Sequence, residues 1–235
     1  MLVALLAALL PLLAPADASA PGVPSGDTAV ATLRPAAAPP DPVRDSLSTY
    51  YARQDTSGVE RLYQRHARTR EQQLLCLYRL FPMTLDAGYL DDIPSERGVT
   101  SARQLSLIAA LWAYKAAHGP AWALPRYGRR SERILDLALA RDPDEPYALL
   151  VKGQSLLYKP RVFGGDAAEA QRTFERLRTV LRGRRAPGLH PFEAEVWIWM
   201  AVRKQDRAEG ARLQRRLLAR NPPALFRTFL TDPPS

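Results

Sequence analysis

From residue 42 onward, apolar side chains recur at every third or fourth position, which is the period of an amphipathic α-helix. Alternation of apolar and polar residues, which would indicate β-strands, is almost absent from this part of the chain. Glycine and proline divide the pattern into segments of helical length. We therefore expect an all-α protein whose helices are joined by short connections.

The first part of the helical body, residues 42–100, contains two helical patterns and a looser stretch. One apolar face lies within residues 43–51. A second pattern runs without glycine or proline over residues 59–81, which predicts one long helix that Pro82 ends. Residues 83–100 are rich in turn formers and are expected to be mostly loop.

The second part, residues 101–223, is predicted to contain three pairs of helices. Two of these helices, 101–117 and 191–204, are apolar on nearly all sides and must therefore be covered by several neighbours. A layered array of helices provides that cover. Residues 224–235 follow two prolines and are expected to form a C-terminal tail. The expected helices span residues 101–117, 129–141, 145–158, 167–181, 191–204 and 207–220.

The connection between the helices of the second pair reads as a structured turn. Pro160 ends the first helix, and Gly164-Gly165 permits positive φ. Asp166 is expected to cap the next helix, with Glu169 as its capping-box partner, and Phe163 is expected to pack beneath the turn. The glycines could also form a phosphate-binding loop, but the Lys-Ser/Thr ending of such loops is absent.

The segment from Tyr147 to Leu181 resembles a tetratricopeptide repeat. Gly153 takes the place of the small residue in the first helix, and Ala170-x3-Phe174 matches the pair in the second helix. The repeats before and after share the helix endings Arg141-Asp142-Pro143 and Arg220-Asn221-Pro222. The connection within the pair is longer than the family pattern. It looks like the Pro-x-x-Phe-Gly-Gly turn of a divergent group of bacterial exported tetratricopeptide-like proteins.

This resemblance covers about residues 101–223 and implies a right-handed superhelix of antiparallel helix hairpins with a concave groove. In that family the first helix of each pair lines the groove, and aromatic and arginine side chains are suitable anchors for a ligand. The alternative is that Tyr158 and Trp199 fill the seam between helices. By resemblance, the expected ligand-binding residues are Tyr147, Gln154, Tyr158, Trp199 and Arg203.

The N-terminal segment carries the pattern of an export signal. Residues 2–13 are almost wholly apolar, a run too short to span a bilayer but of the length of a signal-peptide hydrophobic region. Small-x-small cleavage motifs follow within residues 14–20. We expect a signal peptide over residues 1–20, or an uncleaved anchor, and an Ala/Pro-rich disordered linker over residues 21–41. The expected location is therefore outside the cytoplasm, periplasmic or secreted, with membrane contact only through an uncleaved anchor.

The chain carries a formal net charge of +9 with 33 Lys and Arg residues, nearly all arginine. Such a charge attracts polyanions, but no nucleic-acid motif accompanies it, so we expect mostly solvated helix faces and no specific nucleic-acid partner. The turn 182–185, Arg-Gly-Arg-Arg, leaves a binding site for phosphate or acidic groups open. The single cysteine, Cys76, excludes an intramolecular disulfide and is expected to be a buried apolar residue.

The residues that most often perform catalysis show no productive spacing. The closest carboxylate pairs, Asp91-Asp92 and Glu193/Glu195, are expected to be solvated or, in a first helical turn, favoured by the helix dipole. No nucleophile, metalloprotease or dinucleotide motif is present. The three histidines are far apart in the sequence and none has a second ligand at metal-binding spacing. They are His66, His118 and His190.

We therefore expect no catalytic residue, metal or cofactor, and a non-enzymatic scaffold or adaptor that binds a protein, peptide or other ligand in a helical groove. Two alternatives belong to other classes. One is an arginine-rich helical protein that binds polyanions or a membrane surface. The other is an unrecognised all-helical hydrolase, which would need a pocket with converging acidic or histidine side chains.

Overall fold

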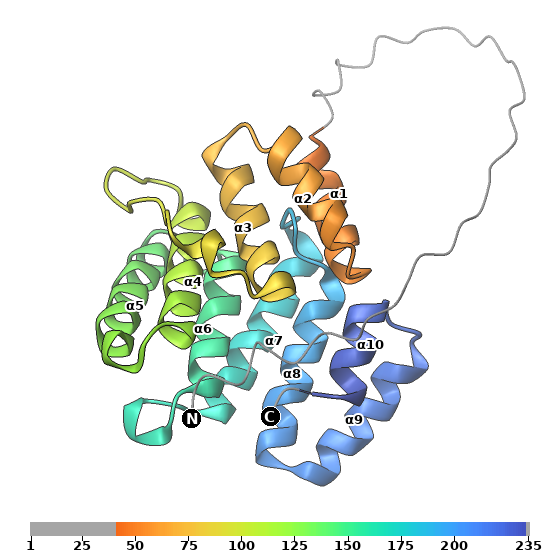
Figure 1. Ribbon diagram of the computed structural model, residues 1–235. Helices are drawn as coiled ribbons and strands as arrows, with labels where there is room; N and C mark the ends of the chain where they lie inside the picture. Colours follow the sequence, from red (N-terminus) through yellow and green to blue (C-terminus); the bar gives the residue numbers. More distant parts are fainter. Residues whose placement is uncertain (1–40, 234–235) are drawn as a thin grey trace, which may run out of the picture.

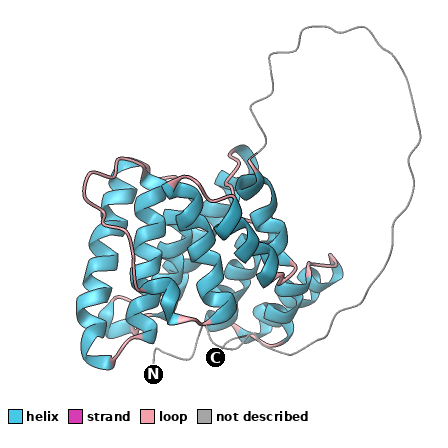
Figure 2. Ribbon diagram, turned by 45° about the horizontal axis from the view of Figure 1, so that its top comes forward, coloured by secondary structure: helices cyan, strands magenta, loops and turns pink. Residues whose placement is uncertain are grey.

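The structure, a computed structural model, describes residues 41–233, and its only regular secondary structure within them is helix (Figures 1 and 2). The expected all-α fold class is therefore confirmed. The expected signal peptide and all but the last residue of the expected linker lie outside the described residues. The ten α-helices are α1 (Pro42–Ala52), α2 (Thr56–Arg65), α3 (Arg70–Thr84), α4 (Ala102–His118), α5 (Leu124–Arg141), α6 (Pro146–Tyr158), α7 (Ala167–Gly183), α8 (Pro191–Gln205), α9 (Arg207–Ala219) and α10 (Ala224–Thr231).

Helices α4 to α9 pack as three successive hairpins, α4/α5, α6/α7 and α8/α9, in agreement with the predicted pairs. The first helices of the pairs run in the same direction. Arg103 at the start of α4 bonds to Glu145, which precedes α6, and Lys204 at the end of α8 donates to the carbonyl of Leu157 at the end of α6. The α4–α5, α6–α7 and α8–α9 connections therefore lie at one end of the array, toward the bottom of Figure 1.

Within the second hairpin, the small residue predicted from the sequence does allow close packing. A Cβ placed on Gly153 would lie 2.4 Å from a ring carbon of Phe174. Gly153, Ala170 and Phe174 are all buried at this contact between α6 and α7. A methyl group at position 153 would therefore force the two helices apart.

The turn between α6 and α7 matches the sequence prediction only in part. The carboxylate of Asp166 accepts hydrogen bonds from the backbone of Ala168 and Glu169, as expected for a helix cap. The capping-box role of Glu169 is wrong, because its side chain bonds instead to Arg172 one turn along α7. Phe163 is also not packed beneath the turn; it is 74% exposed.

The prediction of one long helix over residues 59–81 is wrong. Helix α2 ends at Arg65, and α3 starts anew behind a reciprocal capping box formed by Thr69 and Gln72. Pro82 does not end α3, which continues to Thr84. A proline in the last turn of a helix removes a single backbone hydrogen bond, so the helix tolerates it there.

The N-terminal helices and α10 lie against the hairpins. Tyr78 on α3 stacks on Tyr114 of α4 and meets Tyr147 of α6 edge-on. Residues 224–231, part of the expected C-terminal tail, form α10, whose Phe229 ring packs against Trp197 of α8. Helix α3 thus covers α4 and α6, and α10 covers α8.

Candidate functional site

Two of the five expected groove residues are buried in the protein interior. Tyr147 has no exposed surface, and its hydroxyl donates to the carbonyl of Pro187 at 2.7 Å. Trp199 is 1% exposed and donates from its indole nitrogen to the carbonyl of Gly210 at 3.0 Å. The expectation that these two side chains line an open groove is therefore wrong, because neighbouring elements of the same chain cover them.

The other three residues do not form a shared open surface with them. Gln154 and Tyr158 are half-buried, and the Tyr158 ring meets Trp197 edge-on. Arg203 is exposed and lies with its guanidinium 5.6 Å from the centre of the Trp199 ring. Tyr158 and Trp199 thus follow the alternative considered from the sequence, in which they fill the seam between helices.

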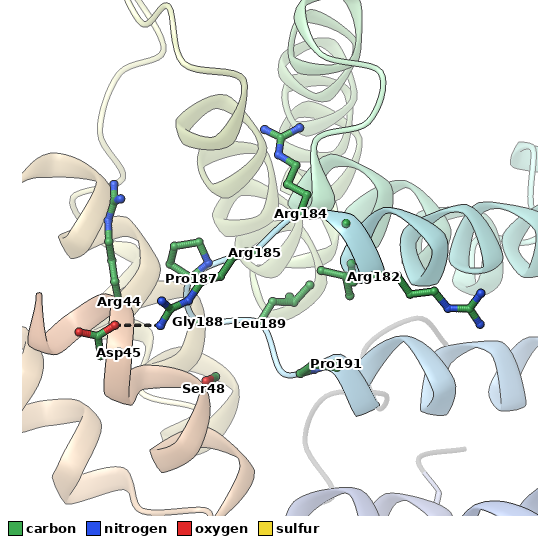
Figure 3. Close-up of a pocket in the computed structure, with 13 residues that line it drawn as sticks. Arg44, Asp45, Ser48, Arg182, Arg184, Arg185, Pro187, Gly188, Leu189 and Pro191 are labelled. Carbon is green, nitrogen blue, oxygen red and sulfur yellow. Dashed lines mark hydrogen bonds and ion pairs between the residues drawn. The ribbon is translucent and has the colours of Figure 1, made fainter. Parts of the chain in front are cut away.

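The basic turn at residues 182–185 does lie at a cleft (Figure 3). The cleft has a volume of about 430 Å³ and lies between α1 and the loop that joins α7 to α8. We call it the arginine cleft. Its charged lining is four arginines and one aspartate, namely Arg44, Arg182, Arg184, Arg185 and Asp45.

The loop of the cleft is held firmly from the protein interior. Gly188 adopts a φ of +75°, and a Cβ there would lie 2.9 Å from both Leu47 and the Tyr147 hydroxyl, so only glycine fits. The Gly188 carbonyl accepts two hydrogen bonds from the guanidinium of Arg79, at 2.7 and 3.2 Å. The adjoining Pro187 carbonyl accepts from Tyr147. The buried Tyr147 therefore supports this site instead of contacting a ligand.

Arg79 is itself part of a buried ion pair with Glu193. The two side chains are 2% and 5% exposed and are joined at two points, at 2.9 and 2.8 Å. Burial alone would lower the pKa of Arg79, but Glu193, with smaller effects from Tyr51 and Tyr147, outweighs it and the net direction is upward. Glu193 does lie in the first turn of α8, but it is buried and not solvated. Spacing rules could not find this pair, since its members lie 114 residues apart.

Two arginines of the cleft are tied into a chain of ion pairs along one side of the protein. Arg44 pairs with Glu71 at 3.0 Å, and Arg184 pairs with Glu145 at 3.0 Å. Arg103 bridges these two glutamates, at 3.3 and 3.1 Å. Glu145 is 2% exposed, and burial raises its pKa against the opposing effect of the two arginines. These ion pairs hold the guanidinium groups of Arg44 and Arg184 in place and limit their movement toward a ligand.

The other two arginines are much freer. Arg185 is 78% exposed and pairs across the cleft with Asp45, itself 50% exposed, at 2.9 Å (Figure 3). An ion pair this exposed is weak, so another carboxylate can replace Asp45 at little cost. Arg182 is exposed and has no carboxylate within ion-pair distance in the part of the chain that the structure describes. Two guanidinium groups are thus available to an anionic ligand.

The described residues contain no group of three His, Cys, Asp or Glu side chains that could hold a metal ion. His118 and His190 are half-buried, His66 is exposed, and Cys76 is fully buried.

Between residues 41 and 233, no helix has both the length and the apolar character needed to cross a bilayer. Comparisons of the chain with models of protein families, with curated proteins and with solved structures find no match.

Proposed function

We propose that this protein is a non-enzymatic binding module that holds an acidic segment of a partner protein in the arginine cleft. The observation that carries the proposal is a pair of exposed arginines at the cleft, Arg182 and Arg185, on a loop fixed by Arg79 and Tyr147. Planar guanidinium groups bind carboxylates at two points, which gives direction as well as attraction. A cavity of about 430 Å³ accommodates a few side chains of a peptide.

The exposed pair of Arg185 and Asp45 supports an acidic ligand. Asp45 already occupies the position that a ligand carboxylate would take against Arg185, 2.9 Å away. A ligand with several carboxylates would displace it, and a further carboxylate along the same segment would engage Arg182, whose side chain points away from Asp45 (Figure 3). The ligand therefore gains contacts that the free protein lacks, while the ion pairs of Arg44 and Arg184 remain in place.

The wider setting of the proposal is an exported scaffold with tetratricopeptide-like hairpins. The contact of Gly153 with Phe174, and the order of the three hairpins, support that scaffold. The apolar run at residues 2–13 and the small-x-small motifs that follow support export out of the cytoplasm.

A binding experiment with paired peptides tests this function. A fluorescent Glu-rich peptide and the same peptide with Gln in place of Glu are titrated with the protein, and the anisotropy is followed. The Glu peptide is expected to bind, and the Gln peptide is not. Arg182→Ala/Arg185→Ala is expected to weaken binding about tenfold, since each exposed charged contact is worth ~0.5–1 kcal/mol.

The control is Arg53→Ala/Arg215→Ala, which removes the same charge at two exposed positions outside the cleft. This variant is expected to bind almost as well as the unmodified protein. Equal losses in the two double variants would mean that net charge alone attracts the peptide, and the cleft assignment would be wrong. Tight binding to heparin that is insensitive to both changes would favour a general polyanion binder instead.

A further inference from the structure

Three large apolar side chains stand out into solvent on two neighbouring connections. Trp122 is 78% exposed on the α4–α5 turn, and Val162 and Phe163 are 85% and 74% exposed on the α6–α7 turn. Since α4 and α6 run in the same direction, both turns lie at the same end of the array. We call this end, residues 119–123 and 159–166 with Asp206 of the α8–α9 turn, the turn edge.

The α6–α7 turn holds its two apolar side chains outward on a well-bonded backbone. The amide of Phe163 donates to Pro160 at 2.9 Å, and the amide of Gly165 donates to the same carbonyl at 3.1 Å. Gly164 has a φ of +88°, and a Cβ on Gly165 would lie 1.9 Å from the carbonyl oxygen of Lys159. This close approach requires glycine and sets the direction of residues 161–163. The display of Val162 and Phe163 is thus built into the fold.

Unpaired arginines surround these apolar side chains. Arg126 follows the first turn, Arg161 lies within the second, and Arg207 follows the third; all three are exposed. Within residues 41–233 none of the three has a carboxylate at ion-pair distance, unlike most arginines near the cleft. The nearby Asp166 and Asp206 are exposed and accept hydrogen bonds from helix amides through one carboxylate oxygen, so three arginines stand against two aspartates here.

We propose that the turn edge docks onto the surface of an anionic lipid bilayer. Tryptophan favours the boundary between headgroups and acyl chains, and the apolar Val162 and Phe163 side chains enter the layer beside it. The three arginines meet lipid phosphates, to which guanidinium groups bind at two points. Apolar side chains on separate protruding turns suit a deformable bilayer, and the combination of apolar tips with flanking cations is typical of interfacial binding.

This placement is compatible with a ligand in the arginine cleft. Helix α7 has 17 residues and joins the two regions, with Ala167 next to the turn edge and Gly183 at the cleft. At 1.5 Å per residue the two regions are roughly 25 Å apart along the helix. Membrane docking and peptide binding can therefore occur together, and failure of one does not imply failure of the other.

A site-specific fluorescent label tests the proposal in the full chain. Val162→Cys is labelled with an environment-sensitive dye, because the native Cys76 is fully buried and does not compete for the reagent. The control is Leu137→Cys, which labels the exposed face of α5 about four turns beyond Trp122. Both proteins are mixed with vesicles of phosphatidylglycerol and phosphatidylcholine, and with phosphatidylcholine alone. Because both variants keep residues 1–40, any vesicle binding by that segment is common to them.

We expect the dye at position 162 to brighten several-fold and shift to the blue with anionic vesicles, and the dye at position 137 to change little. Arg126→Glu/Arg161→Glu is expected to remove most of this response. An equal response at both positions, no response at position 162, or the same response with uncharged vesicles would overturn the proposal. So would a concentration-dependent dimer that Val162→Ser/Phe163→Ser abolishes, since the turn edge would then be a contact between two copies.

Discussion

The guanidinium of Arg79 on α3 and the carboxylate of Glu193 on α8 form a two-point ion pair in the protein interior, at 2.9 and 2.8 Å. The same guanidinium lies 4.0 Å from the centre of the Tyr51 ring on α1 and donates to the Gly188 carbonyl. Burial raises the pKa of Tyr51 to about 12, so it stays a neutral phenol at neutral pH. One side chain thus joins α1, α3, α8 and the loop of the arginine cleft.

Loss of one member of this pair is expected to be far more harmful than loss of both. Arg79→Met leaves the Glu193 carboxylate buried without a counter-charge and is expected to lower the free energy of unfolding by about 3–5 kcal/mol. Arg79→Met/Glu193→Leu removes both charges and is expected to cost clearly less than the single change. Urea denaturation followed by circular dichroism measures both values. A double variant as unstable as Arg79→Met would contradict this account.

Replacement of Gly153 is expected to strain the second hairpin. A Cβ at this position would lie 2.4 Å from the Phe174 ring, which is fully buried and cannot move aside. We expect Gly153→Ala to lower the free energy of unfolding by about 1–3 kcal/mol, which is typical of overpacking. Thermal or urea denaturation provides the measurement.

The matched control for that change is Gly128→Ala, in the first half of α5. A Cβ on Gly128 would meet nothing within 4 Å. Alanine in a helix is better than glycine by about 0.5–1 kcal/mol, so this variant is expected to be more stable than the unmodified protein. If both alanine variants shifted stability in the same direction, close packing at Gly153 would not be the cause.

The pH dependence of stability is expected to report the protonation of His190. Its Nδ1 accepts a hydrogen bond from the backbone amide of Phe192 at 3.1 Å and caps α8, which only the neutral ring can do. Burial lowers the pKa of His190 below its ordinary value of 6.5, and of its two charged neighbours Glu193 acts upward and Arg79 acts downward. The folded state therefore binds this proton less readily than the unfolded chain. The contribution of neutral His190 to the free energy of unfolding is therefore complete above pH 6.5, and it is lost as the pH falls below that value.

A comparison of His190→Asn with the unmodified protein isolates this effect. Asparagine keeps a capping oxygen but does not titrate in this range. The free energy of unfolding, measured by urea denaturation at about pH 7.5 and about pH 5.5, is expected to fall more for the unmodified protein. Equal changes in the two proteins would assign the acid sensitivity to other groups, among them His118, whose pKa is also lowered by burial.

Cys76 is expected to be inert in the folded protein. Its side chain has no exposed surface, and burial, with a smaller effect from Asp41, raises the pKa of the thiol to about 12. The thiolate is the reactive form, so a colorimetric thiol reagent at about pH 8 is expected to react only after urea is added. Rapid reaction of the native protein would show that the core around α3 opens readily.

The helix pairs from residue 101 onward were predictable because their patterns are local. Three local signals located these helices: the spacing of apolar residues, the prolines, and the Asp or Asn residues at helix ends. The predicted boundaries lie within a few residues of the observed ones in most cases. The largest error there is the start of α5, predicted at residue 129 and observed at Leu124, with Pro125 in the first turn, where a helix tolerates proline. The capping box of Thr69 and Gln72 was also a local sign, and it would have divided α2 from α3.

The candidate site was less predictable, because it depends on contacts between distant segments. The basic turn at residues 182–185 was visible in the sequence, but its partner Asp45 on α1 lies 140 residues from Arg185. Tyr147 was expected to face a ligand because its helix matches a groove-lining helix, and nothing local indicates that α3 covers it. A sequence pattern shows which face of a helix is apolar, and it does not show which neighbour covers that face.

The first and the last helices of the described chain, α1 and α10, touch each other. Most helical repeats contact only their neighbours, so such arrays tolerate added or removed units and can unfold from one end. Here the two ends meet, and a further hairpin inserted between them would break their contact. Removal of either helix would therefore uncover part of the other.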